Sequence, residues 1–181
     1  LLTRYKKAKV SLPGGCAIGT RPVDIHLFAL KKFGAKIKIR DGYIIAEAKK
    51  GLIGNNIRFP SISVGATENA LIAASCAKGT TYLSNCAREP EIKDLTFFLK
   101  KMGVKIQWVG DRKIKISGSE NLKSTSHNVM FDRIEAGTFL IAGALAGKKI
   151  KITGIETKIL KKEISILKKM GVKMKIYKND I

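Results

Sequence analysis

The chain of 181 residues has 45% hydrophobic and 27% charged residues and a formal net charge of +21. This composition predicts a soluble globular protein with a hydrophobic core, long enough for one large domain or parts of two. No apolar run approaches the roughly 18 residues that a membrane-spanning helix needs, which argues against membrane insertion. Three widely spaced cysteines, Cys16, Cys76 and Cys86, argue against a disulfide framework and a CxxC metal site, and they fit a reducing compartment.

The high positive charge has two interpretations, a surface that binds nucleic acid or anionic membranes and a solvated surface rich in lysine. Lysine alternates with isoleucine at 36–39 and 113–116, and lysine pairs stand near expected helix ends at 31–32, 100–101 and 168–169. These lysines fill outward positions throughout the chain rather than building one stripe. The distribution favours the solvated surface, and no nucleic-acid partner is predicted.

The two ends of the chain resemble internal positions of a longer protein. The basic start lacks a following apolar stretch and a small-residue cleavage site, so no signal peptide is predicted. The first residue is Leu1 rather than Met, and the last segment stops shortly after Tyr177. We expect both ends to be cut from a longer chain.

The first unusual segment is the loop at 11–22, where three glycines and two prolines surround Cys16. Glycine and proline here allow backbone shapes that other residues avoid. A cysteine on such a loop is normally exposed, and the nearby positive charge of Arg21 favours its reactive thiolate. From these residues alone, a reactive thiol and an unreactive small side chain in a turn remain equal alternatives.

A helix is expected directly after this loop, with Pro22 close to its first turn. Asp24 has two interpretations, an acceptor for a ligand amide and a carboxylate that stabilises the helix start. His26 falls in this helix and His127 in a later polar segment. Neither histidine has a metal-ligand partner at a suitable spacing, so no metal site is predicted.

A second helix start follows the sequence Ser-Ile-Ser-Val-Gly-Ala-Thr at 61–67 and leads into an alanine-rich helix at 66–77. Serine hydroxyls and backbone N–H groups at a helix N-terminus form a natural phosphate site. The signal is weak because many helices begin with serine, and the segment is not a Walker loop. Thr67 and Glu68 are assigned to the helix start rather than to a ligand.

The next helix, at 92–102, follows a polar segment that contains Glu89, Pro90 and Glu91. The two carboxylates have two interpretations, a pair for acid–base chemistry and stabilisers of the helix N-terminus. The helix-start interpretation is favoured because proline is preferred in the first turn. The segment 132–135 stands in the same way before a further helix.

An internal repeat is the strongest organisational signal. The sequence Leu-Lys-Lys-Phe-Gly-Ala-Lys-Ile at 30–37 recurs with small changes at 99–106 and 167–174, which places the glycines 69 and then 68 residues apart. Each copy predicts a helix that ends in two lysines, a glycine in the left-handed conformation, and then a strand.

A second repeated element predicts the architecture. The alanine-rich helix at 66–77 and another at 134–146 each end near a glycine, and strands are expected after them at 80–83 and 149–153. Helices that alternate with strands predict βαβ crossovers with parallel pairing. The fold class is therefore α/β, built of repeated units of about 68 residues that are longer than those of common solenoids.

Four motifs, at 13–24, 63–69, 87–92 and 132–138, resemble the UDP-N-acetylglucosamine 1-carboxyvinyltransferase (enolpyruvyl transferase) family in order and spacing, and the resemblance covers essentially the whole chain. It implies a two-domain protein in which each domain is an inside-out α/β barrel of three repeated units. Residues 1–130 would form most of one barrel domain. Residues 131–181 would begin the incomplete return into the other, after a polar, serine-rich segment that predicts a junction near Met130.

The resemblance also implies an activity. Members of the family are cytoplasmic and transfer the enolpyruvyl group of phosphoenolpyruvate to the 3′-hydroxyl of UDP-N-acetylglucosamine with release of phosphate, the first committed step of peptidoglycan synthesis, without a cofactor. The position that matches Cys16 supplies the proton to the methylene carbon of phosphoenolpyruvate. The same thiol can capture phosphoenolpyruvate as a covalent adduct, and it is the target of fosfomycin.

Two segments match the family's nucleotide-sugar site. Arg21, Pro22, Val23, Asp24 and Ile25 match the segment beside the uracil, and Ser61, Ile62, Ser63, Val64 and Gly65 match the segment at the diphosphate. Many relatives carry lysine where Ser61 stands. Further lysine, asparagine, arginine and aspartate residues of the family site lie outside this chain, so we expect this chain alone to be inactive. No oligomeric state is predicted.

Two alternatives remain. The sibling enzyme that makes enolpyruvylshikimate phosphate shares the fold and the donor, but it does not show this cysteine loop or the nucleotide-sugar segment. A basic nucleic-acid-binding protein is supported by the charge alone, and no recognised nucleic-acid motif accompanies it.

Overall fold

The computed structural model describes residues 1–15, 21–147 and 149–181. These residues form two units, Leu1–His127 and Asn128–Ile181, each with its own core. No helix among the described residues is both long and apolar enough to cross a membrane.

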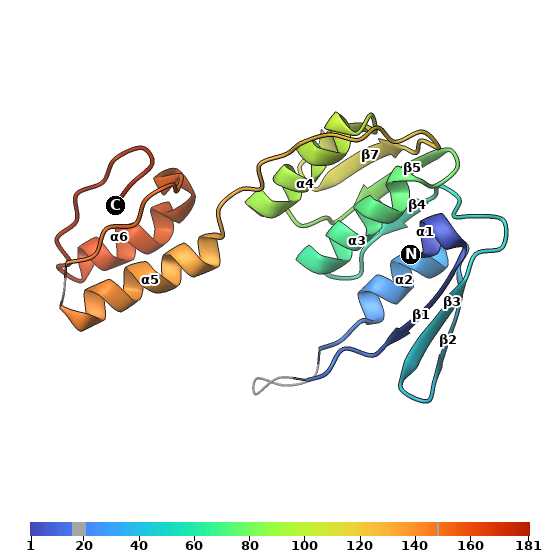
Figure 1. The fold of residues 1–181 in the computed structure, drawn as a ribbon, viewed down its shortest axis with the longest axis horizontal. Helices are drawn as coiled ribbons and strands as arrows, with labels where there is room; N and C mark the ends of the chain where they lie inside the picture. Colours follow the sequence, from blue (N-terminus) through green and yellow to red (C-terminus); the bar gives the residue numbers. More distant parts are fainter. Residues whose placement is uncertain (16–20, 148) are drawn as a thin grey trace. The chain divides into compact units, whose positions relative to one another are not determined.

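Unit 1 contains two sheets and four helices (Figure 1). The strands are β1 (Lys7–Ser11), β2 (Lys36–Arg40), β3 (Tyr43–Glu47), β4 (Asn56–Arg58), β5 (Thr80–Ser84), β6 (Lys105–Gly110) and β7 (Lys113–Ser117). The helices are α1 (Leu2–Tyr5), α2 (Asp24–Lys32), α3 (Val64–Ser75) and α4 (Pro90–Lys101). One sheet has the order β1-β3-β2 and the other the order β4-β5-β7-β6.

The strand pairing corrects part of the sequence prediction. Among the described strands of unit 1, β4 and β5, joined through α3, pair in parallel as expected, whereas the other strand pairs are antiparallel. The reason is a pair of hairpins, β2–β3 and β6–β7. Asp41 and Gly42 connect the first pair with φ angles of 50° and 75°, and such a two-residue turn matches the twist of antiparallel strands. The Asp-Gly dipeptide is a hairpin signal that the interpretation as βαβ crossovers overlooked.

The core of unit 1 is centred on α3, which lies between α2 and α4 in Figure 1. The alanines of α3 are almost fully buried, and their small side chains allow close packing against its neighbours. Phe33, Phe59, Leu71, Ile92 and Ile114 fill the space around it and are at most 1% exposed. The α/β class predicted from the sequence is confirmed, although the described residues form no closed barrel.

Unit 2 consists of α5 (Arg133–Ala146), the short 3-10 helix η1 (Thr157–Leu160) and α6 (Lys161–Lys169). Its core is small and contains Ala136, Leu140, Ile155, Leu160, Ile164 and Leu167. The strands predicted at 149–153 and after Gly171 are wrong, because the described residues of this unit form only one isolated bridge, between Thr153 and Asp180. A strand needs a hydrogen-bonded partner along its length, and here the backbone bonds are confined to a few residues at 152–157 and 177–181.

Candidate functional site

Cys16, the predicted proton donor, lies outside the residues that the structure describes. The described part of its loop ends at Gly15 and resumes at Arg21. The role of this thiol therefore stays a prediction, and the described part of the candidate site consists of the two predicted substrate segments.

The structure brings these two segments together at neighbouring helix N-termini. Residues 21–23 lead directly into α2, and residues 61–63 lead directly into α3. Figure 1 shows the two helices side by side. His26 in the first turn of α2 lies against Gly65 in the first turn of α3, since a Cβ atom on Gly65 would stand 3.2 Å from Cε1 of His26.

The other ends of α2 and α3 are also neighbours, which shows that the helices run in the same direction. The segment after Leu52 bonds to both, because Ile53 N–H donates to the carbonyl of Phe33 at 3.0 Å and Gly54 N–H donates to that of Lys78 at 2.8 Å. Phe33 and Lys78 stand just after the ends of α2 and α3. Both N-termini consequently open on the same side of unit 1.

The start of α3 has the properties of an anion site. Ser63 caps the helix, since its hydroxyl oxygen accepts the Ala66 N–H at 3.2 Å. The first N–H groups of a helix have no acceptor within it, and the helix dipole adds partial positive charge. A phosphate group could therefore bind here without a lysine, which matters because position 61 is serine in this chain.

The predicted site residues are accessible to different degrees. The exposed members are Arg21, Pro22, Asp24, Ser61 and Ile62, whereas Val23, Ile25, Ser63, Val64 and Gly65 are half-buried. Asp24 is the first residue of α2, and its neighbour Val23 caps the helix without a side-chain hydrogen bond. The exposed members leave both helix starts open to a ligand.

A groove of about 380 Å³ lies in unit 1 beside α2 and α3, and Val23 at the start of α2 is the one member of the two predicted segments that lines it. Its walls include Pro13, Val23, His26 and Asn69, together with apolar side chains of the β1-β3-β2 sheet. Among the wall residues that the sequence analysis did not assign to the site, His26 and Asn69 carry polar groups on α2 and α3. They could have been found from spacing, because His26 follows the 21–25 segment and Asn69 stands one helical turn after Gly65.

The electrostatics of His26 follow from its position. Burial lowers the pKa of His26, and the charge of Asp24 opposes this by raising it. The neutral ring has one acceptor nitrogen, and Nδ1 lies 3.4 Å from Nδ2 of Asn69. In that arrangement the Asn69 amide donates to Nδ1, and the ring proton lies on Nε2.

The residues around Glu89 serve a helix start. Glu89 is the N-cap residue of α4, with Pro90 in the first turn, and the Glu89 carboxylate accepts the Arg88 N–H at 2.7 Å. The Arg88 side chain pairs with Asp111 in the β6–β7 turn. Glu91 stands in the first turn of α4, where a carboxylate stabilises the helix start as predicted, whereas the Glu89 side chain makes no capping hydrogen bond to the helix.

The two cysteines that the structure describes, Cys76 and Cys86, belong to neither of the two substrate segments. Cys86 is fully buried, and burial raises the pKa of its thiol to about 12, while Arg112 lowers it in part. Cys76 is half-buried near the end of α3. No group of three or more His, Cys, Asp or Glu residues in the described chain is placed to hold a metal ion.

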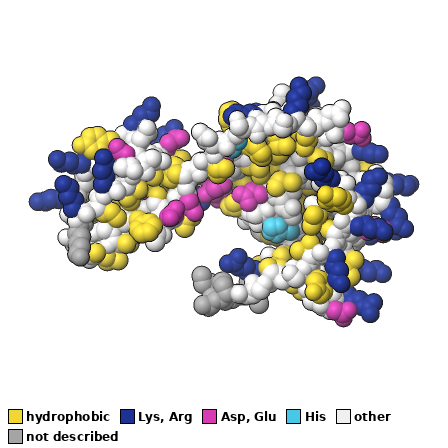
Figure 2. Space-filling model, in the orientation of Figure 1, with side chains coloured by type: hydrophobic (Ala, Val, Ile, Leu, Met, Phe, Trp, Pro, Cys, Tyr) yellow, Lys and Arg dark blue, Asp and Glu magenta, His cyan; other side chains and the backbone are white. Residues whose placement is uncertain are grey.

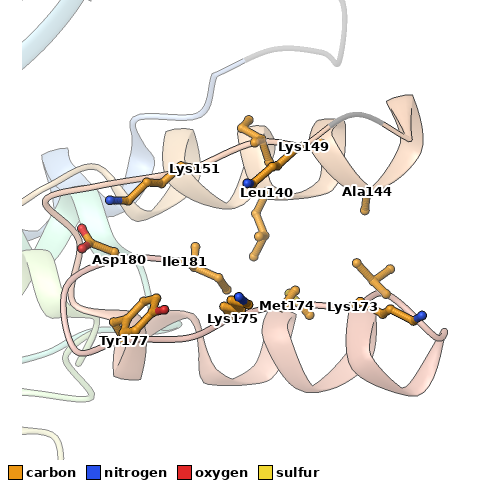
Figure 3. Close-up of a pocket in the computed structure, with 13 residues that line it drawn as sticks. Leu140, Ala144, Lys149, Lys151, Lys173, Met174, Lys175, Tyr177, Asp180 and Ile181 are labelled. Atoms are coloured by element: carbon orange, nitrogen blue, oxygen red, sulfur yellow. The ribbon is translucent and has the colours of Figure 1, made fainter.

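Unit 2 has a larger groove, of about 700 Å³, that contains none of the predicted site residues. Figure 3 shows it between α5 and the segment after α6, with an apolar floor that includes Leu140, Met174 and Ile181. Four lysines line it: Lys149, Lys151, Lys173 and Lys175. Figure 2 shows lysine and arginine side chains spread over both units on the visible face, which agrees with a solvated basic surface.

The fold and the site define a class, that of α/β proteins with a repeated helix–glycine unit and an anion-compatible site at paired helix starts. The EPSP synthase (3-phosphoshikimate 1-carboxyvinyltransferase) family profile matches residues 1–181. The chain belongs to this family.

Individual relatives agree. The chain is 62% identical over 181 residues to UDP-N-acetylglucosamine 1-carboxyvinyltransferase from Pelagibacter ubique. The match covers 100% of this chain and 43% of the relative. It is 52% identical over 174 residues to the protein of the same name from Rickettsia prowazekii. This match covers 96% of this chain and 42% of the relative. The chain thus spans less than half the length of these curated relatives.

Solved structures share the fold. The enolpyruvyl transferase NikO from Streptomyces tendae matches 99% of this chain and 44% of its own, with a TM-score of 0.82 and 24% identity. EPSP synthase from Acinetobacter baumannii matches 96% of this chain and 40% of its own, with a TM-score of 0.67 and 20% identity.

Proposed function

We propose that the full-length protein carrying this chain is a transferase that moves the enolpyruvyl group of phosphoenolpyruvate to the 3′-hydroxyl of UDP-N-acetylglucosamine. The observation that carries the proposal is the 62% identity to a curated enzyme of that name over all 181 residues. In the same proposal the enzyme acts in the cytoplasm, and its product enters peptidoglycan synthesis.

The geometry of unit 1 supports a nucleotide-sugar site. The uracil segment 21–25 and the diphosphate segment 61–65 begin neighbouring helices whose N-termini open on the same side. A diphosphate beside the start of α3 would meet backbone N–H donors and the positive end of the helix dipole. A uridine beside Arg21 and Pro22 would then lie at the start of the helix next to α3.

In this mechanism Cys16 donates a proton to the methylene carbon of phosphoenolpyruvate while the sugar hydroxyl attacks the adjacent carbon. A tetrahedral adduct forms, and the hydroxyl proton passes to a base. Breaking the carbon–oxygen bond to phosphate and returning a proton from the new methyl group to the Cys16 thiolate then forms the enol ether, releases phosphate and regenerates the thiol. Binding in a fixed orientation supplies much of the acceleration, because it replaces a bimolecular encounter.

The two units fit the domain arrangement of this proposal. Leu1–His127 would form most of one barrel domain, and Asn128–Ile181 would begin the second.

The first test is a phosphate-release assay with the full-length protein. Release should require both phosphoenolpyruvate and UDP-N-acetylglucosamine, and the 181-residue chain alone should show no turnover. Shikimate 3-phosphate in place of the nucleotide sugar tests the sibling activity. Release with shikimate 3-phosphate and none with UDP-N-acetylglucosamine would refute the proposal.

The second test locates the reactive thiol by fosfomycin labelling and peptide mapping. Cys16 should carry the label, and Cys86 provides an internal control because its pKa of about 12 keeps it protonated in the folded protein. Cys16→Ser should abolish labelling and lower kcat by a factor of about 100 or more, as expected for loss of a general acid. Undiminished kcat in this variant would exclude Cys16 as the proton donor.

A further inference from the structure

We propose that His26 is a positioning residue that holds the start of α3 against the start of α2 and so fixes the spacing between the two substrate segments. The inference deepens the proposed function, because it assumes that residues 21–25 and 61–65 bind the same nucleotide sugar. His26 belongs to neither segment.

The contact is close and involves both edges of the ring. A Cβ atom on Gly65 would lie 3.2 Å from Cε1 and 3.4 Å from Nε2 of His26. Nδ1 lies 3.4 Å from the Asn69 amide nitrogen. Gly65 and Asn69 are one helical turn apart and therefore share a face of α3, so the imidazole of His26 spans the first turns of this helix.

The presence of glycine at position 65 is explained by this contact rather than by backbone conformation. Gly65 lies inside α3 and is not among the glycines with positive φ. Glycine within a helix is unfavourable relative to alanine. A side chain at position 65 would instead press on the ring of His26, and one of the two would have to shift by a few tenths of an ångström.

The opposite side of the α3 start is fixed independently. The Thr67 hydroxyl donates to the Ser63 carbonyl at 2.7 Å and accepts the Ala87 N–H at 3.1 Å. Thr67 is fully buried. His26 thus provides the second support, on the side that faces α2.

The position of His26 in the chain links this support to the ligand. His26 follows Ile25, the last residue of the uracil segment, and Gly65 is the last residue of the diphosphate segment. A change of the His26–Gly65 contact consequently moves one segment relative to the other. Misplacement of groups that hold the ligand weakens binding in the ground state and the transition state alike, which raises KM and leaves kcat unchanged.

The experiment measures KM for each substrate, kcat and Tm in the full-length enzyme. His26→Ala should raise KM for UDP-N-acetylglucosamine about tenfold, with kcat and KM for phosphoenolpyruvate within about twofold of wild type. Asn55→Ala is the matched control, because Asn55 donates to the Lys32 carbonyl at the far end of α2, at 2.8 Å. It should leave all three kinetic constants unchanged.

Two substitutions separate positioning from direct ligand contact. Asparagine at position 26 places a polar atom near the position of Nδ1, whereas glutamine places one near Nε2. His26→Asn keeps an acceptor for the Asn69 amide but loses the ring against Gly65, so it should recover only part of the loss in KM, and His26→Gln should behave like His26→Ala. Rescue by glutamine instead of asparagine would show that Nε2 binds the ligand and would overturn the positioning role.

A double-mutant cycle tests the pair itself. Gly65→Ala should raise KM for the nucleotide sugar in the wild type and have little further effect in the His26→Ala background. Additive effects, an unchanged KM in His26→Ala, or equal changes of every kinetic constant together with a fall in Tm would each overturn the inference. If the wild-type enzyme itself does not use UDP-N-acetylglucosamine, the proposed function fails and this inference fails with it.

Discussion

The same eight-residue pattern ends α2 and α4 in unit 1 and α6 in unit 2, yet only the copies in unit 1 continue into a strand. The helix ends themselves are alike. Gly34, Gly103 and Gly171 have φ angles of 93°, 99° and 88°. The residue after each glycine donates its N–H five positions back at 3.1, 3.1 and 3.0 Å, which is the bond that closes a helix with a left-handed glycine.

The copies differ in the segment after the cap. Lys36–Arg40 and Lys105–Gly110 pair with adjacent strands β3 and β7, whereas no strand forms among residues 172–177. Packing differs as well, since Phe33 is fully buried and its counterpart Met170 is 73% exposed. The comparison shows that a helix cap forms from its own few residues, while a strand requires a partner distant in sequence.

The largest expected effect on stability comes from a substitution in β7, the strand that pairs with β6 after the second copy of the pattern. Ile114 in β7 is fully buried between Leu83 and Trp108 of the adjacent strands. Ile114→Ala should lower the free energy of unfolding of unit 1 by about 2–5 kcal/mol, because it leaves a cavity. Met174→Ala, at a half-buried position of unit 2, should cost less than about 1 kcal/mol.

Urea unfolding followed by Trp108 fluorescence measures this difference, since the single tryptophan lies in unit 1. Circular dichroism follows both units together. An equal loss of unfolding free energy in the two variants would contradict the view that a partner strand holds the segment after the cap in unit 1 and that no partner strand does so in unit 2.

An intermediate effect is expected at the caps. Gly103→Ala and Gly171→Ala should each cost about 1–2 kcal/mol, because a side chain disfavours the left-handed conformation. No atom lies within 4 Å of the added Cβ at either position, so the cost should be similar in both units. Hydrogen exchange of the Val104 and Val172 amides measures it, with Gly110→Ala as a control outside the left-handed region. A penalty confined to one unit would show that the cap is not autonomous.

The smallest expected effect concerns charge in α3. Burial raises the pKa of Glu68, and the charge of Glu91 raises it further. The folded chain therefore holds this proton more tightly than the unfolded chain, and the contribution to stability is lost as the pH rises through the folded-state pKa. Glu68→Gln should be more stable than wild type at pH 7 by up to about 0.5 kcal/mol, and this advantage should vanish below pH 4.

Thermal unfolding at the two pH values checks the sign. Glu163→Gln is the control in unit 2, where the carboxylate stands in the first turn of α6. A carboxylate at that place is stabilised by the helix dipole, so this substitution should lower Tm slightly at pH 7. A destabilising Glu68→Gln at pH 7 would contradict the prediction.

These differences explain how far the sequence could be interpreted. Helices α2 to α6 and the glycine caps of the repeat were predicted because their signals are local, and α3 and α5 lie within two residues of the expected ranges, whereas α1 and η1 were not predicted. The antiparallel hairpins were missed, although Asp41-Gly42 carried the signal. The strands of unit 2 were predicted wrongly because the repeat contains no information about their partners.

The candidate site shows the same limit. Each substrate segment could be recognised from its own residues, and both lie at helix starts as expected. That the two starts are neighbours, and that His26 and Asn69 lie between them, depends on the packing of α2 on α3. The hydrophobic periodicity of one helix does not indicate which face of another helix packs against it.

The parallel arrangement of α2 and α3 has an energetic consequence. Both helices begin on one side and end at the segment after Leu52, so their positive dipole ends stand next to each other and repel. A polyanion bound at the proposed site would neutralise both ends at once, and its binding would then stabilise the folded state.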